Sequence, residues 1–432
     1  MTSESNAVPA TVGLAGLLSE YADQLVGAAL ATVSTDGEVE VAFVGRPDAS
    51  SIEPVTAATP FSLGSVTKLL TAGAICQMVE AGQLSFEDPL VRWLPEVRKL
   101  TYGAEITIQH LLCHSSGLVD LFEPIAGIDA LIDRLANFGP IAKPGALLSY
   151  TNVGYILLGE VIRRIAADSW ENEVRRRFLQ PLGMSSTWLG DESNVPERPA
   201  VDHDFTPDGS VALTEMWPRL PGIFAAAGTT ATASVEDAVR LLGALLFGCV
   251  ANIRLFSDPL CQAMQNVQIA MPGPGVFGDG WGLGWCVIDE TQDLVGHIGG
   301  TSVFALGSRA LGKAAIFLSN TPNGATIGEA LTRRAIGVDA SVALIGSHSN
   351  SPLGSFVGRY RSPTFAIEIA EEGATLVMSS TMNDERVTLL RIGETTFMGR
   401  IGTLPTEVNF ITDAANGPPQ YLHIALRALA RV

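Results

Sequence analysis

The sequence is poor in positive charge. Its 432 residues include 27 basic and 45 acidic side chains, which give a formal net charge of −18. Only four of the basic residues are lysines: Lys68, Lys99, Lys143 and Lys313. Binding to nucleic acid or to an anionic membrane surface needs a basic footprint, so this balance argues against both as main partners. Hydrophobic residues make up 47% of the chain, which excludes general disorder.

Cysteine is scarce, and long apolar runs are missing. The five cysteines are odd in number and form no C-x-x-C, so we expect neither a disulfide framework nor a zinc site. The longest apolar stretch, near residues 241–250, is too short to span a bilayer. The first residues lack a positive segment followed by an apolar one, so no secretory signal is predicted. These absences predict a soluble, cytoplasmic protein.

The chain is long enough for one large domain and a smaller one, at roughly 100–200 residues per domain. Strand patterns near the start, at residues 25–33 and 38–44, form a predicted hairpin around Asp36-Gly37. Further strands are predicted in the second half, at residues 282–288, 294–298, 301–308 and 314–318. Between them, residues 83–221 are predicted to be a subdomain of helices joined by long loops. For residues 1–345 this order predicts an α/β (α+β) fold, with an antiparallel sheet flanked by helices. The edge strands of the sheet are expected from both ends of the chain.

Helical patterns are clearest in four segments. Residues 65–80 are apolar nearly all round, which predicts a helix buried in the middle of the domain. The other three segments are residues 107–113, 154–167 and 235–246. Asn152 is expected to cap the helix over residues 154–167.

The C-terminal residues 350–432 have a different pattern. Apolar and polar positions alternate between frequent turns, for example at residues 365–369, 374–379, 387–392, 396–399 and 421–425. This pattern predicts a small antiparallel β-barrel. The polar stretch at residues 346–352 marks the expected boundary before it.

The sequence Ser65-Val66-Thr67-Lys68 opens the buried helix. Residues three apart share one helix face, so the Lys68 amine can reach the Ser65 hydroxyl. Burial and the positive end of the helix dipole both disfavour the ammonium form, which lets Lys68 accept a proton near neutral pH. The same helix end aims backbone N–H groups at an oxyanion. A capping serine followed by a surface lysine is the structural alternative, but a lysine on so apolar a helix would be buried without an evident acidic partner.

Two further motifs could complete a site. Tyr150-Thr151-Asn152 lies in a turn before a helix, where the phenol could share proton transfer with Lys68 and Asn152 could hold a substrate carbonyl or the lysine. His297-Ile298-Gly299-Gly300 lies on a predicted strand, where glycine lets a substrate backbone approach and the Gly300 N–H could be an oxyanion donor. Each motif alone also fits a purely structural role, but together they favour a catalytic centre.

With these motifs in this order, the chain resembles the serine β-lactamase and penicillin-binding-protein superfamily in its class C-like branch. That branch includes esterases, D-aminopeptidases, amidases, transacylases and peptide cyclases. The sequence around the motifs also resembles this superfamily, at Phe61–Lys68, Gly82–Pro89, Ile106–Leu118 and Pro181–Met184. The resemblance covers about residues 15–340. Residues 350–432 are similar to lipocalin-like barrels attached to some members, with Gly358-Arg359-Tyr360 as the anchor.

The resemblance implies roles for named residues. Ser65 is the nucleophile, Lys68 and Tyr150 transfer protons, and His297 lines the pocket or assists Tyr150. Asn152, Gly299 and Gly300 bind substrate, and no metal or organic cofactor is needed. True β-lactamases carry a lysine where His297 stands, which argues against efficient β-lactam hydrolysis. His110 and His114 belong to a helix–loop segment that is structural in relatives.

The predicted enzyme is a serine hydrolase or acyltransferase. It forms an acyl-enzyme from an ester, thioester or amide and passes the acyl group to water or an amine, as a transacylase of secondary metabolism would. The expected partners are a small-molecule or peptidyl acyl substrate and a candidate amine acceptor, and the oligomeric state is left open. A D-amino-acid-specific peptidase or peptide cyclase is the alternative, ahead of a true β-lactamase or a non-catalytic penicillin-binding module.

Overall fold

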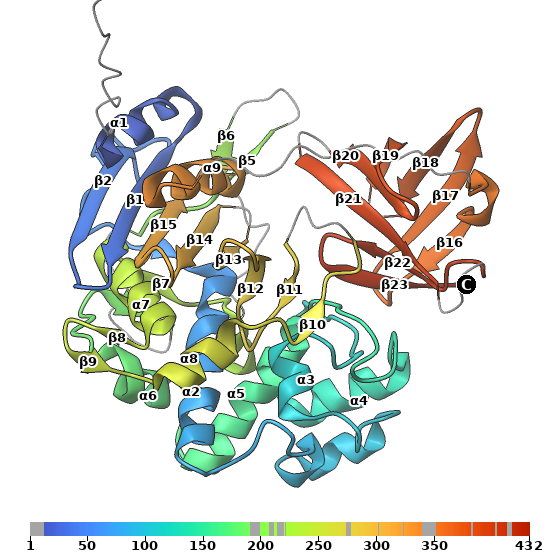
Figure 1. Ribbon diagram of the computed structural model, residues 1–432, viewed down its shortest axis with the longest axis horizontal. Coiled ribbons are helices and arrows are strands. Elements are labelled where there is room, and N and C mark those ends of the chain that lie inside the picture. Colours follow the sequence, from blue (N-terminus) through green and yellow to red (C-terminus); the bar gives the residue numbers. More distant parts are fainter. Residues whose placement is uncertain are drawn as a thin grey trace, which may run out of the picture.

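An antiparallel sheet, flanking helices and a closed C-terminal β-barrel form the fold, as the sequence predicted (Figure 1). The computed structural model describes residues 13–190, 199–206, 211–213, 220, 222–273, 278–300, 302–322, 324–338, 351–381, 383–401, 404–412 and 417–432. The predicted boundary at residues 346–352 lies largely outside the described residues. The division into domains at residues 345 and 350 therefore stays a prediction.

The main sheet has eight strands. In spatial order they are β10 (Ile269–Ala270), β11 (Gly280–Trp281), β12 (Cys286–Asp289), β13 (Leu294–Gly299), β14 (Val303–Ser308), β15 (Lys313–Ser319), β1 (Gly27–Ser34) and β2 (Val39–Gly45). Every neighbouring pair is antiparallel. The predicted N-terminal hairpin is β1–β2, and it joins the sheet through pairing of β1 with β15.

Two details of the predicted sheet are wrong. The N-terminal hairpin does supply one edge, β2, but the last strand, β15, lies inside the sheet and β10 forms the other edge. The strand expected over residues 282–288 is also broken, because the chain turns between β11 and β12. Gly282 N–H donates to Trp285 O in this turn, and Gly284 has a φ of +100°.

Helices cover both faces of the sheet (Figure 1). Alternate residues of β1 explain this, since side chains of a strand point to opposite faces. Ala28 and Leu30 pack in the cluster that contains Leu331 of α9 (Gly324–Ile336) and residues of α1 (Leu14–Ser19). Ala29, Ala31 and Val33 pack in the main core, together with α7 (Val235–Phe247) and α2 (Lys68–Glu80).

Helices joined by loops lie between the two sets of strands, as predicted, while the bounds of the helical subdomain at residues 83 and 221 stay a prediction. These helices are α3 (Ile108–Leu112), α4 (Ile128–Phe138), α5 (Asn152–Ala166) and α6 (Trp170–Val174), with single turns η3 (Leu90–Arg92), η4 (Pro95–Lys99) and η5 (Arg175–Leu179). Helix α8 (Asp258–Gln265) and the turns η1 (Ala22–Gln24), η2 (Gly64–Thr67) and η6 (Gly222–Ala227) lie elsewhere in the chain. Small sheets link these parts, formed by β3 (Phe61–Ser62), β7 (Thr232–Ala233) and β4 (Thr187–Trp188), by β5 (His203–Phe205) and β6 (Val211–Leu213), and by β8 (Cys249–Val250) and β9 (Ile253–Arg254).

The C-terminal barrel follows the turn η7 (Leu353–Ser355). Its strands are β16 (Gly358–Arg361), β17 (Ala366–Glu372), β18 (Thr375–Ser380), β19 (Asn383–Arg391), β20 (Thr396–Ile401), β21 (Leu404–Ile411), β22 (Tyr421–Ile424) and β23 (Arg427–Arg431). Pairing of β16 with β23 closes it. Aromatic side chains fill the interior, among them Phe356, Tyr360, Phe397 and Phe410. Figure 1 shows the barrel beside the end of the sheet where β10 and β11 lie.

Membrane-spanning helices and metal-binding clusters are both absent from the described residues. None of the described helices is long and apolar enough to cross a membrane. The described part of the chain also holds no group of three or more His, Cys, Asp or Glu side chains placed to bind a metal ion.

Candidate active site

Ser65 lies in η2, a single 3₁₀ turn that runs directly into α2. The sequence predicted one continuous helix from Ser65. In the structure, the S-x-x-K motif instead spans the junction between a 3₁₀ turn and an α-helix. The turn is tightly held from two sides. A Cβ on Gly228 would lie 2.2 Å from Gly64 O, and a Cβ on Gly64 would lie 2.9 Å from the Gly299 carbonyl carbon. Glycines therefore let η6 and the end of β13 approach the chain on either side of Ser65, whose side chain keeps partial exposure.

Lys68 is fully buried at the start of α2. Its Nζ lies 3.0 Å from Ser65 Oγ, 2.7 Å from Asn152 Oδ1 and 2.5 Å from Ala227 O. Burial lowers the pKa of Lys68 to about 7, and the charges of Asp120 and Arg427 oppose one another on it. A neutral amine has two hydrogens, which the two carbonyl oxygens can accept. Its lone pair is then left for the Ser65 hydroxyl proton.

Asn152 does not cap α5, contrary to the prediction. Thr151 does so, with its side chain accepting from Val153 N–H at 3.1 Å, while Asn152 is the first helical residue. The Asn152 side chain instead bridges two charged groups. Its Oδ1 accepts from Lys68, and its Nδ2 donates to Asp120 Oδ2 at 3.2 Å. The amide orientation follows from these partners, because the amine can donate to Oδ1 and the carboxylate can only accept from Nδ2.

Tyr150 lies against both Ser65 and Lys68. Lys68 Nζ lies 5.1 Å from the centre of the Tyr150 ring, and the Ser65 side chain is close enough to lower the pKa of the phenol in part. Burial raises the pKa of Tyr150, so the phenol holds its proton in the resting enzyme. It is placed to donate a proton first and to accept one later. Ring packing fixes Tyr150, since the His114 ring lies 4.1 Å away and that of Trp281 lies 5.6 Å away.

His297 is buried on β13, next to Tyr150 and Trp281, with ring centres 6.4 and 5.5 Å away. Its Nδ1 lies 2.9 Å from Ile298 O, and its buried Nε2 has no hydrogen-bond partner among the described residues. Burial, helped by the Lys68 charge, lowers the pKa of His297 to about 3. The imidazole is therefore neutral near pH 7 and can offer or accept one hydrogen bond, but it cannot supply a cation.

Gly299 and Gly300 end β13 beside the Ser65 turn. A Cβ on Gly299 would lie 2.4 Å from Leu63 O, so this glycine is required for packing against the turn. Gly300 has a φ of +59°, in the left-handed region that favours glycine, and a Cβ there would meet no described atom within 4 Å. The predicted substrate contacts of both residues, and the predicted oxyanion role of the Gly300 N–H, remain predictions.

The two helix–loop histidines have structural contacts. His110 forms a capping box with Thr107 at the start of α3. His114 is fully buried, and its Nδ1 accepts from Thr151 N–H at 3.2 Å. Burial lowers the pKa of His114 well below its usual range. His114 is thus a neutral support for Tyr150 and for the start of α5.

Two charged residues at this site, Asp120 and Arg427, were not predicted from the sequence. Asp120 Oδ1 accepts from Asn152 N–H at 2.7 Å and from Thr151 Oγ1 at 3.2 Å. Arg427, from the barrel strand β23, donates to Asp120 Oδ2 at 3.0 Å and places its guanidinium 5.4 Å from the Tyr150 ring centre. Neither lies in a recognisable motif, so no pattern in the sequence pointed to them.

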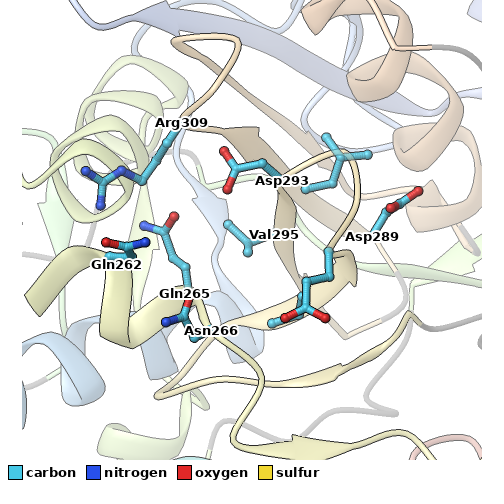
Figure 2. A pocket seen from close by; sticks show the side chains of 10 residues that line it. Gln262, Gln265, Asn266, Asp289, Asp293, Val295 and Arg309 are labelled. Atoms are coloured by element: carbon cyan, nitrogen blue, oxygen red, sulfur yellow. The ribbon is translucent and has the colours of Figure 1, made fainter. Parts of the chain in front are cut away.

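A separate cavity of about 310 Å³ lies between α8 and the β12–β13 turn. Figure 2 shows Gln262 and Gln265 on one side and Asp289 and Asp293 on the other. None of the predicted site residues lines it. The catalytic candidates therefore gather elsewhere, around Ser65.

Several known proteins resemble this chain in sequence or in fold. The family model described as beta-lactamase matches residues 14–339. Esterase EstB from Burkholderia gladioli is 30% identical over 348 residues, which cover 69% of this chain and 86% of the esterase. The D-amino acid amidase from Ochrobactrum anthropi, in complex with L-phenylalanine amide, has a TM-score of 0.63 and 25% identity over 75% of this chain and 95% of the amidase.

A further solved structure extends the similarity to the C-terminal barrel. The crystal structure of SurE has a TM-score of 0.79 and covers 97% of this chain and 98% of its own. At 24% identity this match shows the fold alone. The family match covers most of the chain and includes the segments that carry Ser65, Lys68, Tyr150 and His297. The chain therefore belongs to the beta-lactamase family and is a serine hydrolase or acyl-transfer enzyme in that general sense.

Proposed function

We propose that the protein forms an acyl-enzyme on Ser65 from an ester, thioester or amide and transfers the acyl group to water or to an amine. The observation that carries the proposal is the contact between Lys68 Nζ and Ser65 Oγ, 3.0 Å apart, with the pKa of the amine lowered to about 7. A buried neutral amine next to a partly exposed hydroxyl is an activated nucleophile.

Acylation would start with attack of Ser65 Oγ on the substrate carbonyl carbon, while Lys68 takes the hydroxyl proton. A tetrahedral oxyanion forms, for which the N–H groups of Ser65 and Gly300 are the candidate donors. As the bond to the leaving group breaks, Tyr150 gives that group its proton. The resulting phenolate is stabilised by the Lys68 ammonium and the Arg427 guanidinium near its ring.

Deacylation would reverse these roles. The Tyr150 phenolate takes a proton from an incoming water or amine, which attacks the acyl carbon. The bond to Ser65 Oγ breaks, and Lys68 returns the proton to it. His297 lines the site as a neutral group, and Asn152 holds Lys68 in place or contacts the substrate. The cycle leaves the enzyme unchanged, and water or the amine ends up with the acyl group.

A second candidate is a D-amino-acid-specific peptidase, amidase or peptide cyclase. The similarity to a D-amino acid amidase, at 25% identity, supports this second candidate. In this case the acyl group would be peptidyl and the acceptor would be water or the substrate's own amine. The neutral His297 fits either candidate better than a β-lactamase, whose substrate carboxylate calls for a cation.

The direct test is labelling of Ser65. We expect the protein to gain one adduct from a fluorophosphonate, seen as a mass increase of the intact protein, and Ser65→Ala to gain none. A panel of ester, thioester and D-peptide substrates, with and without amine acceptors, then separates hydrolysis from transfer by product mass. An adduct that persists in Ser65→Ala would overturn the proposal.

A further inference from the structure

The β22–β23 hairpin of the barrel reaches the catalytic centre with its tip. Leu426 O accepts from Tyr150 N–H at 2.7 Å, and Ala428 N–H donates to Ser149 Oγ at 3.1 Å. The Leu426 side chain packs against the cluster that contains Tyr150 and Trp281. The barrel therefore holds both the backbone and the surroundings of Tyr150.

The turn at this tip adopts an unfavourable conformation. Ala425 and Leu426 have φ angles of +47° and +67°, in the left-handed region. Tight hairpin turns of this kind prefer Asn-Gly or Gly-Gly, because most side chains are disfavoured in that region. Strained backbone of this sort persists where surrounding contacts hold it, and it gathers at functional sites.

Arg427 follows directly after the strained turn and places a positively charged guanidinium from the barrel next to Asp120 and Tyr150. It pairs with Asp120 at 3.0 Å, and the two residues are 307 positions apart in the sequence. Asp120 in turn accepts from Asn152 through both the backbone N–H and the side-chain Nδ2, at 2.7 and 3.2 Å. Asn152 Oδ1 accepts from Lys68. A continuous chain of contacts thus runs from the barrel to the candidate base.

We propose that Arg427 and Asp120 are positioning residues of the catalytic centre, through which the C-terminal barrel fixes the side chain of Asn152 and the charge around Lys68. The inference rests on the proposed function, because it assigns Lys68 the role of base. It gives the barrel a task in catalysis rather than in stability alone.

The groups that face Lys68 show why the pair matters. Uncharged partners surround its amine: Ser65, Asn152, the Ala227 carbonyl, Tyr150, Tyr155 and the neutral rings of His114 and His297. Asp120 and Arg427 add opposite charges, the first raising and the second lowering the pKa of Lys68. Loss of one charge leaves the other unbalanced, so the two single variants must shift the base in opposite directions.

The test is the rate of Ser65 labelling by a fluorophosphonate, followed by intact mass across about pH 5 to 9. In Arg427→Gln we expect the rising limb of the profile to move about one unit to higher pH, which makes labelling about tenfold slower below the limb. In Asp120→Asn we expect the limb to move to lower pH, with a lower plateau because Asn152 is less firmly held. Arg427→Lys should keep the wild-type limb.

Arg359→Gln is the matched control. Arg359 is also on the barrel, in an exposed ion pair with Glu368, so this variant removes the same charge and leaves the pair of Arg427 with Asp120 in place. Its profile should be that of the wild type, and thermal unfolding checks that each variant folds. Limbs that stay in place, or move the same way in Arg427→Gln and Asp120→Asn, would overturn the inference alone. A wild type that takes no label would overturn the proposed function and the inference with it.

Discussion

Asn152 Oδ1 accepts a hydrogen bond from Lys68 Nζ at 2.7 Å, while Thr151 takes over the capping of helix α5. Because Thr151 caps the helix, the side-chain amide of Asn152 is available to contact Lys68 in the catalytic centre. A capping Asn152 would have used its oxygen on a backbone N–H, and Lys68 would then have lost one of its acceptors.

Replacement of either proton-transfer residue should slow acylation strongly. For Lys68→Ala and Tyr150→Phe we expect rates at least about a hundredfold lower, the size of a lost general base or acid. Burst kinetics with a p-nitrophenyl ester measure the step, and circular dichroism confirms folding. If Tyr150→Phe acylates at a near-normal rate, Tyr150 is a packing residue.

Acylation should rise with pH through the pKa of Lys68. The ammonium form has no lone pair for the Ser65 proton, so activity depends on the neutral form, and burial sets its pKa at about 7. The rate is expected to increase about tenfold per pH unit below this value and to level off above it. His297, with its pKa lowered to about 3, should add no limb between pH 5 and 9. A profile that falls across this range as pH rises would contradict the assignment of Lys68.

His297 should set the preference for substrate charge. A neutral imidazole gives a carboxylate no charge-assisted contact, so we expect weak or no hydrolysis of nitrocefin and clear activity on a neutral p-nitrophenyl ester. His297→Lys should raise kcat/KM for nitrocefin relative to the ester, because the added interaction is electrostatic. Equal wild-type activity on both substrates would show that His297 does not determine this preference.

Gly228 should be more sensitive to substitution than an unpacked glycine of similar conformation. Its φ is +96°, and an added Cβ would lie 2.2 Å from Gly64 O, so Gly228→Ala must displace the Ser65 turn. We expect a loss of about 2 kcal/mol or more in the free energy of unfolding, together with slower acylation.

Gly82→Ala provides the matched control for this substitution. Gly82 has a φ of +69° and no described atom within 4 Å of its Cβ position. The variant Gly82→Ala therefore introduces the backbone strain of a positive φ without the clash. A cost of about 1 kcal/mol is expected, with acylation unchanged. Urea unfolding and ester burst kinetics measure both effects. Equal effects of the two variants on acylation would show that close packing at Gly228 does not position Ser65.

Local patterns determined much of the fold. Alternating apolar residues predicted the β1–β2 hairpin and the C-terminal barrel, and an apolar stretch predicted the buried helix α2, because burial on one face or all round leaves a direct mark on the sequence. The break between β11 and β12 was missed. It depends on a turn at Gly284, whose Cβ position lies 2.5 Å from Ala72 on α2, and packing of that kind has no local signature.

The candidate site divides in the same way. Spacing alone brought Ser65 and Lys68 together, since a helical turn places residues three apart on one face. Tertiary structure decided the rest: that Tyr150 lies against Ser65, that Asn152 holds Lys68, and that Arg427 reaches Asp120 from the barrel. A helix fixes its own neighbours within a few residues. Contacts between side chains 84 or 307 positions apart exist only once the separate elements have packed, so no stretch of sequence encodes them by itself.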